Sequence, residues 1–260
     1  MPRQGEGISP HERLPDPTSV LTTFTFTPGS GIAAGGAALT AGGKYRILRT
    51  LEVDEYDEPV PASEIMALSA LRAPPSDNAF RGTSRRAAKL SIAEAEMETF
   101  SDVKDLIETL PDHDTMAGHP DISTDRNNNR VDEEKRNIRV RAFLYAASLE
   151  NDRDYHLIVG RDPSKAATYM TVEISGLPPS NSRHFEKLNE ARSAYFEFFG
   201  DGLPGTSYDH YDPPIPVEIE GSLFFDFSHA EGSRPGPSKL RPKMPVVWEI
   251  HPVSKIVFEP

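Results

Sequence analysis

The sequence predicts a mixed α+β protein that is mainly β, with a small OB-like Greek-key barrel in its C-terminal half and an α+β extension before it. Short apolar runs with alternating polarity recur along the chain, as is typical of strands. After residue 138 the expected elements follow the order strand, strand, strand, helix, strand, strand, which is the order of an OB-type barrel. The 24 prolines and 18 glycines in 260 residues indicate many turns and argue against a helical bundle.

The chain is expected to begin with an extended arm. Residues 1–19 are polar and contain four prolines, so we expect them to order only against another surface. Leu21–Thr27 alternates at period two and predicts a strand, and Lys44–Val53 predicts a second one. The Gly/Ala-rich stretch 29–43 between them predicts a flexible connection, because its GGKY end lacks the first glycine and the Ser/Thr of a phosphate-binding loop.

The region 20–137 as a whole is predicted to be α+β, either as a unit of its own or as a decoration of the barrel. Helices are expected at Ser63–Leu71 and at Ser101–Leu110, where apolar residues recur at helical spacing. Lys89–Glu98 fits both a capped helix and a strand. The segment 111–137 is polar and turn-rich, which predicts a solvated junction.

The region 138–260 is predicted to be the barrel domain. Its helix has one apolar side, formed by Phe185, Leu188, Tyr195 and Phe199. The expected elements are strands at Arg139–Leu149, Tyr155–Val159 and Tyr169–Ile174, the helix Phe185–Phe199, and strands at Pro216–Phe227 and Val246–Phe258.

Acidic residues and histidines occur together in or beside four of these strands. They are Asp154 with His156, Glu173, Asp226 with His229, and Glu249 with His251. Two residues that are two positions apart in a strand point to the same face, so the first and last pairs each share a face.

Three interpretations of these residues remain open. The first is a structural polar network of hydrogen-bonded side chains. The second is a divalent metal site for an ion such as zinc or manganese, with ligands His156, His229, His251 and Glu173. The third is a catalytic site in which the same three histidines act as general bases supported by Asp226 and Glu249.

A basic loop precedes the last predicted strand. Gly232–Pro245 (GSRPGPSKLRPKMP) contains no acidic residue, and its cations are Arg234, Lys239, Arg241 and Lys243. In an OB barrel, the loop between the fourth and fifth strands contacts oligonucleotides or oligosaccharides. Trp248 and Tyr211 would then offer rings for stacking. The alternative is a solvated surface loop stiffened by proline.

Composition limits the classes of function. The formal net charge is −12, which disfavours general attraction to a phosphate backbone. The absence of cysteine excludes disulfides, thiolate metal sites and cysteine nucleophiles. No apolar run has the length of a signal peptide core or a membrane span, so we expect a cytoplasmic protein that does not contact membranes.

The C-terminal half also resembles an uncharacterised group of bacterial proteins. The group shares the motifs D-x-D-x-H-L-V-I, M-x-x-E-I-P, G-x-x-F-F-D-F-x-H-G and E-L-H-P-V in this order. In this chain they correspond to Asp152–Val159, Met170–Ile174, Gly221–His229 and Glu249–Val253, and Ala230 stands where the group has its last glycine. No activity is assigned to the group, so the resemblance implies a domain that carries a site and names no function.

Two functions are expected. The first is a non-enzymatic binding or interaction module that contacts its partner through the loop 232–245. That partner would be a protein, a second copy of the chain, or an anionic ligand or nucleic acid. The alternative is a metal-assisted hydrolase acting on phosphodiesters, with His156, His229 and His251 as ligands or bases, and with Glu173, Asp226 or Glu249 in support.

Overall fold

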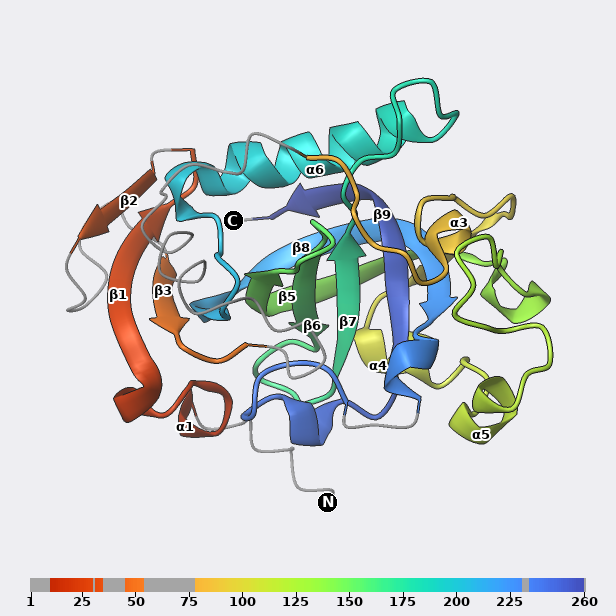
Figure 1. Ribbon diagram of the computed structural model, residues 1–260. Helices are drawn as coiled ribbons and strands as arrows, with labels where there is room; N and C mark the ends of the chain where they lie inside the picture. Colours follow the sequence, from red (N-terminus) through yellow and green to blue (C-terminus); the bar gives the residue numbers. More distant parts are fainter. Residues whose placement is uncertain (1–9, 30, 35–44, 54–77, 231–233, 260) are drawn as a thin grey trace, which may run out of the picture.

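The computed structural model describes residues 10–29, 31–34, 45–53, 78–230 and 234–259 (Figure 1). Residues 1–9, most of the stretch 29–43 and the helix expected at Ser63–Leu71 lie outside the described residues. The described part is a mixed α+β structure, as predicted. It consists of one nine-stranded sheet with the order β2-β1-β3-β8-β9-β7-β6-β5-β4 and a few helices.

The end of the expected arm is not extended. Residues Pro10–Arg13 form the short helix α1, and Pro17–Ser19 form a 3-10 turn. The prediction of an extended conformation is therefore wrong for these residues. The turn forms because Asp16 accepts a hydrogen bond from the backbone N–H of Thr18 while Pro17 occupies its first position.

The two strands predicted in the N-terminal region are present. They are β1 (Val20–Thr27) and β3 (Tyr45–Thr50), and β2 (Gly31–Ala34) pairs with the other side of β1. All three are antiparallel, and β3 continues the sheet by pairing with β8. The N-terminal strands are thus joined to the C-terminal strands in one sheet.

The strands and the helix predicted after residue 138 are all present. They are β5 (Asn137–Leu149), β6 (Tyr155–Gly160), β7 (Tyr169–Ile174), α6 (Phe185–Phe199), β8 (Asp209–Phe225) and β9 (Trp248–Phe258). β5, β6 and β7 form an antiparallel meander, and β9 lies parallel to β7. β8 pairs antiparallel with both β9 and β5, so the pairings run in a ring through five strands.

Helix α6 packs along β9, as Figure 1 shows. Its buried side comprises Leu188, Ala191, Arg192, Tyr195 and Phe199, which includes three of the four predicted residues. The helix ends at Gly200, whose φ of 50° lies in the left-handed region that favours glycine. No helix within the described ranges is both long enough and apolar enough to cross a bilayer.

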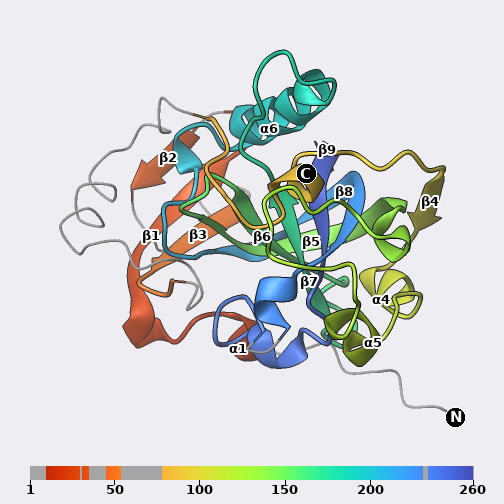
Figure 2. The same ribbon diagram turned by 45° about the vertical axis from the view of Figure 1, so that its right-hand side comes forward.

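Short elements connect the two regions (Figure 2). They are α3 (Arg86–Lys89), β4 (Met97–Phe100), α4 (Val103–Ile107), α5 (His113–Ala117) and a 3-10 turn at Asp132–Glu134. The ambiguous segment Lys89–Glu98 therefore ends one helix and begins a strand, and β4 lies parallel to β5. The helix expected from Ser101 starts at Val103, because Asp102 caps it by accepting a hydrogen bond from the N–H of Lys104.

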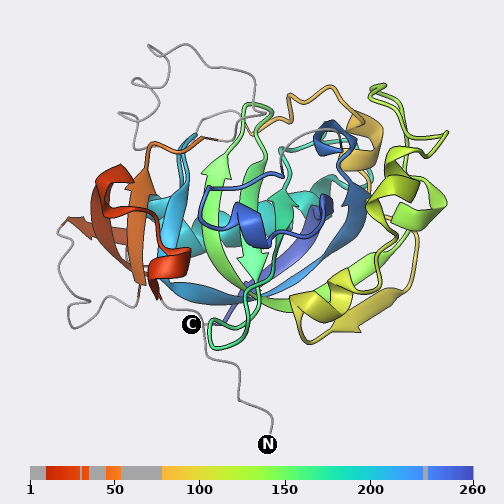
Figure 3. The same ribbon diagram turned by 90° about the horizontal axis from the view of Figure 1, so that it is seen from below.

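The two faces of the central strands have different surroundings. In β6, Tyr155, Leu157 and Val159 point into the main core, whereas Ile158 belongs to a smaller cluster on the opposite face. That cluster includes Leu240 and Met244 from the predicted basic loop. Figure 3 shows the described part of this loop, which includes a 3-10 turn at Arg241–Lys243, crossing the strands. His156 alternates with Tyr155 and Leu157 and so shares the face of Ile158.

Candidate metal centre

Three adjacent strands place acidic and histidine side chains on one face. In the register of the sheet, His156 of β6 lies opposite Glu173 of β7, and Thr171 of β7 lies opposite Glu249 of β9. His251 follows Glu249 by two residues and shares its face. The same-face pairing predicted from the sequence brings these side chains together because β6, β7 and β9 are neighbours.

Glu173 lies at the centre of the group. One of its oxygens, Oε1, is 3.5 Å from Nδ1 of His156, and the other, Oε2, is 2.7 Å from Nδ1 of His251. Each carboxylate oxygen therefore faces a different histidine. The two histidines come from β6 and β9, the strands on either side of β7.

Each histidine also contacts further carboxylates. Nδ1 of His156 is 2.7 Å from Oε1 of Glu150, with which it forms a hydrogen bond. Nε2 of His251 is 3.2 Å from Oδ2 of Asp154, and its Nδ1 is 3.5 Å from Oε2 of Glu249. The result is two sets of potential ligands that share Glu173. In each set one atom from every residue lies within 4.8 Å of the others, and the sets are Glu150–His156–Glu173 and Asp154–Glu173–His251.

The turn between β5 and β6 positions Asp154 and Glu150. The backbone N–H of Glu150 donates to the carbonyl of Asp154 at 2.9 Å, which closes the turn. Arg153 adopts a φ of 78° within it. Oδ1 of Asp154 accepts a hydrogen bond from the N–H of Gly176 at 2.6 Å, so this oxygen is fixed and Oδ2 is directed toward His251.

The centre is buried and its polar atoms are incompletely paired. The side chains of Asp154, His156, Glu173, Glu249 and His251 are between 0% and 3% exposed. Several of their atoms have no hydrogen-bond partner among the residues that the structure describes. These atoms are Oδ2 of Asp154, Nε2 of His156, Oε2 of Glu173, both carboxylate oxygens of Glu249 and both ring nitrogens of His251.

Burial shifts the acidic groups toward their protonated forms. It raises the pKa of Glu249 to about 8, and the negative charge of Glu173 acts in the same direction. Burial together with Asp152 raises the pKa of Asp154 to about 7. Burial and Glu173 also raise the pKa of Glu150 well above its usual range. Near neutral pH these carboxyl groups therefore retain protons when no cation is bound.

Glu173 and the histidines shift in the opposite sense. Burial acts to raise the pKa of Glu173, but the charges of His251 and Lys89 outweigh it and hold this pKa well below its usual value. Burial acts to lower the pKa of His251, and Glu173 outweighs it, so this pKa is raised well above the usual value. Glu150 raises the pKa of His156 in the same way. Glu173 is thus the anion of the group.

One margin of the centre reaches solvent. The side chains of Lys89, Glu150 and Asp152 are 15%, 16% and 18% exposed, in contrast to the buried groups behind them. Nζ of Lys89 lies 3.7 Å from Oδ2 of Asp152 and 5.8 Å from the ring centre of Phe224. A cation and two carboxylates therefore border the centre on this side.

His229 and Asp226 lie outside both sets of ligands. The predicted fourth strand ends at Phe225, and Asp226 caps the 3-10 turn Phe227–His229 by accepting a hydrogen bond from the N–H of Ser228. Nε2 of His229 is 3.3 Å from Oδ2 of Asp226, and neither residue belongs to either set. Asp226 therefore has a structural role as the acid that caps this turn.

The residues of the predicted binding loop differ in their exposure. Lys239 and Lys243 are exposed, whereas Arg234 and Arg241 are half-buried. Nε of Arg241 donates to the carbonyl of Gly236 at 2.9 Å. The buried side chains of Leu240 and Met244 pack the loop against the sheet. Two lysines of the loop thus remain available to a partner.

The aromatic residues expected beside this loop are buried. Trp248 and Tyr211 are each 1% exposed. Nε1 of Trp248 donates to the carbonyl of Pro111, and its ring packs against Phe225. Both rings belong to the main core, so in this structure neither presents a face on which a base could stack.

Sequence reasoning did not assign a role to Glu150 or Lys89. Glu150 lies in a turn, where strand alternation gives no information about side-chain direction. Lys89 lies in α3, more than sixty positions from the motifs that it approaches. From the sequence, Asp154 was expected to share a face with His156. In the structure, its side chain contacts His251 of another strand. The D-x-D-x-H spacing was the available signal for Asp154.

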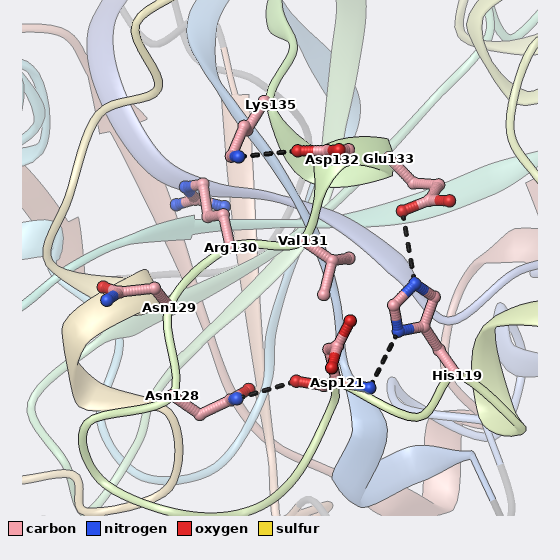
Figure 4. Close-up of a pocket in the computed structure, with 9 residues that line it drawn as sticks. All are labelled: His119, Asp121, Asn128, Asn129, Arg130, Val131, Asp132, Glu133 and Lys135. Carbon is pink, nitrogen blue, oxygen red and sulfur yellow. Dashed lines mark hydrogen bonds and ion pairs between the residues drawn. The ribbon is translucent and has the colours of Figure 1, made fainter.

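A surface cavity of about 370 Å³ lies apart from these ligands (Figure 4). Figure 4 shows His119 pointing toward Glu133, with their atoms Nε2 and Oε2 separated by 3.5 Å. Arg130 forms one wall of the cavity, and its Nη2 donates to the carbonyl of His251 at 2.6 Å. The guanidinium is occupied by backbone carbonyls, so it supports the fold of β9 and is not directed at a ligand.

Comparison with family models, with curated proteins and with solved structures finds no match to this chain. The function must therefore be inferred from the geometry of the site.

Proposed function

We propose that the protein binds a divalent metal ion at the group Asp154, Glu173, Glu249 and His251, on the face of an OB-like barrel. One observation carries the proposal. Buried carboxylate and imidazole atoms from three chain segments lie within 4.8 Å of one another, and several of them make no hydrogen bond of good geometry with the described residues.

The barrel part of the proposal is supported by the strand pairings. The five strands β5 to β9 with α6 between the third and fourth follow the OB order, and the first strand pairs with the fourth while the third lies parallel to the fifth. OB folds bind ligands on the face of their second and third strands. His156 and Glu173 lie on the corresponding strands, β6 and β7.

A metal ion accounts for the centre better than a network of hydrogen bonds. A satisfied network pairs its buried atoms, because a buried polar atom without a partner costs about 1–3 kcal/mol. Here Nδ1 of His251 and Oε2 of Glu173 form an ion pair at 2.7 Å, but this contact does not have the geometry of a hydrogen bond. A cation would satisfy both atoms at once, and it would replace the protons that the buried carboxyl groups otherwise retain.

The donor set indicates which ions fit. It combines carboxylate oxygens with an imidazole nitrogen and includes no thiolate, since the chain contains no cysteine. Such mixed N/O sites suit Mn²⁺, Zn²⁺ or ferrous iron, and they exclude metals that select for soft sulfur ligands.

Calorimetric titration tests the proposal. Purified protein treated with a chelator is titrated with MnCl₂ or ZnCl₂, and the wild type is expected to bind. His251→Gln should weaken binding by at least about 100-fold, because it removes a direct ligand and loss of a supporting contact alone costs about 10–100-fold. His229→Gln, a change outside both sets of ligands, should bind like the wild type. Absence of binding by the folded wild type would reject the proposal.

The thermal stability of the wild type and of the variant is measured on the same samples. A ligand at 100 times its Kd stabilises the folded state by about 2.7 kcal/mol, so the thermal midpoint of the wild type should rise on adding the metal. A His251→Gln protein that remains folded but shows no rise separates a lost ligand from a lost fold. An equal rise in His251→Gln and the wild type would contradict the assignment of His251.

A metal-assisted hydrolase acting on phosphodiesters is the second candidate function. Lys89 favours it, because this cation stands at the solvent-reaching margin of the centre and could bind the anionic phosphate of a substrate. An ion held by Asp154, Glu173 and His251 would supply an activated water for hydrolysis of the phosphodiester, while Lys89 would hold the anionic phosphate beside it. Bis(p-nitrophenyl) phosphate with Mn²⁺ provides an assay.

The expected result for this second function is turnover by the wild type and a loss of about 10-fold or more in Lys89→Met, which should still bind Mn²⁺. Absence of turnover by the metal-loaded wild type would reject the hydrolase function and leave the metal-binding function intact.

The binding-module interpretation receives less support, because its stacking residues are buried and two of its four cations are half-buried.

A further inference from the structure

We infer that the centre holds two divalent ions and that Glu173 is the carboxylate that bridges them. This inference rests on the proposed metal-binding function and extends it to a second site. The first ion would be held by Asp154, His251 and Oε2 of Glu173, and the second by Glu150, His156 and Oε1 of Glu173.

The orientation of Glu173 supports the bridge. Its two oxygens face two different histidines, which lie on the strands either side of β7. Oε1 lies 3.5 Å from Nδ1 of His156, and the same nitrogen lies 2.7 Å from Oε1 of Glu150, so these three groups meet on the side of Glu173 that faces away from His251.

The number of carboxyl groups in the centre is compatible with two ions. Glu150, Asp154, Glu173 and Glu249 together carry four negative charges when ionised, and two divalent cations balance them. The positive charge of Lys89 acts on Glu173 as well as on Asp152 and contributes to this balance.

The second site lies nearer to solvent than the first. Glu150 is 16% exposed on its side chain, whereas Asp154 and His251 are fully buried. The second ion would therefore enter and leave at the margin formed by Glu150, Asp152 and Lys89. This position predicts that the second ion binds more weakly and is removed first by a chelator.

Metal stoichiometry tests the inference. Chelator-treated full-length protein is dialysed against MnCl₂, and bound manganese per chain is measured by elemental analysis, with electron paramagnetic resonance to detect coupling between neighbouring Mn²⁺ ions. The wild type should bind two ions that are magnetically coupled. His156→Gln should bind one ion without coupling, and His229→Gln, the matched control, should retain two.

The outcomes separate the two proposals. One ion in the wild type would overturn the two-ion inference and leave the proposed metal-binding function intact, whereas no ion would overturn both. Two ions in the wild type without coupling, or two ions in folded His156→Gln, would overturn the bridge or the assignment of His156. The wild-type measurement decides the inference even where His156→Gln does not fold.

Discussion

Glu173 lies between two histidines that are almost a hundred positions apart in the chain, His156 and His251. The sequence identified all three as candidate ligands, because period-two alternation determines which residues of a strand share a face. It also grouped His229 with them. That residue follows the end of β8 in a 3-10 turn, where alternation no longer applies.

Glu150 could not be identified in this way. Its contact with His156 depends on how the turn 150–154 closes, and the hydrogen bond from its N–H to the carbonyl of Asp154 is a property of the folded backbone. Lys89 reaches the centre from α3 and the connecting segment, whose position depends on the buried ion pair between Arg85 and Glu134. No local pattern in the sequence encodes these contacts.

At the same scale, Asp102 supports a prediction about acid stability. Burial acts to raise its pKa, but hydrogen bonds from Arg161 and Lys165 outweigh it and lower the pKa to about 2. The folded state therefore binds this proton less readily than the unfolded state, so the ion pairs stabilise the protein above about pH 4. Their contribution is lost as the pH falls from about 4 toward 2.

Asp102→Asn should lower the free energy of unfolding by about 1–2 kcal/mol at pH 7, a value reduced by the solvent exposure of Lys165. Asparagine retains the helix cap, so the change isolates the ion pairs. Urea denaturation at pH 7, 5 and 3 should show the difference between variant and wild type shrinking at the lowest pH. A difference that stays constant down to pH 3 would contradict this explanation. Asp112 caps α5 and accepts hydrogen bonds from Thr115, which carries no charge. Asp112→Asn should therefore lower the free energy of unfolding less than Asp102→Asn does.

At the scale of elements, β8 departs most from the sequence-based expectation. A strand was predicted from Pro216, because the preceding Asp-Pro-Pro segment is typical of a loop. The strand instead begins at Asp209 and spans 17 residues. Its first part pairs with β3, where Arg49 forms an ion pair with the buried Asp209. Tertiary contacts thus overrode the local preference of the prolines.

Gly221 permits a close approach of β8 to β9. A Cβ at this position would lie 2.5 Å from the carbonyl oxygen of Pro252 and 2.5 Å from Cγ2 of Ile250. The register shifts on both sides of Gly221, next to the stretch of β9 that carries His251. Glycine is therefore required here by the backbone that faces it.

Gly221→Ala is expected to lower the free energy of unfolding by about 1–3 kcal/mol, the usual cost of overpacking a core. Gly205→Ala, where a Cβ would meet nothing within 4 Å, should leave it unchanged or slightly higher. Thermal and urea unfolding of both proteins provide the comparison. Equal stability of Gly221→Ala and the wild type would show that β8 and β9 can separate without cost.

At the scale of the whole molecule, the order of the C-terminal elements was predictable and their assembly was not. Apolar strand patterns located β5, β6 and β7, and one apolar side located the helix α6, because these elements are buried on at least one face. The parallel pairing of β4 with β5 and the attachment of β3 to β8 join segments distant in sequence. Such pairings depend on long-range contacts that a local pattern does not encode.

The ring of pairings from β5 to β9 places β6, β7 and β9 side by side, and this arrangement brings the ligands together. The loop that contains Leu240 and Met244 covers the adjoining part of the same face. Under the proposal made above, this face carries an internal metal centre, where the sequence had suggested an exposed binding surface.

Anomalous X-ray scattering from a crystal of the wild-type protein soaked in MnCl₂ tests the central claim most directly. The claim predicts strong peaks beside Glu173, one of them within about 2.0–2.3 Å of ligand atoms of Asp154 and His251, as is usual for such ions. A map with manganese elsewhere, or with no peak beside Glu173 in a fully soaked crystal, would contradict it.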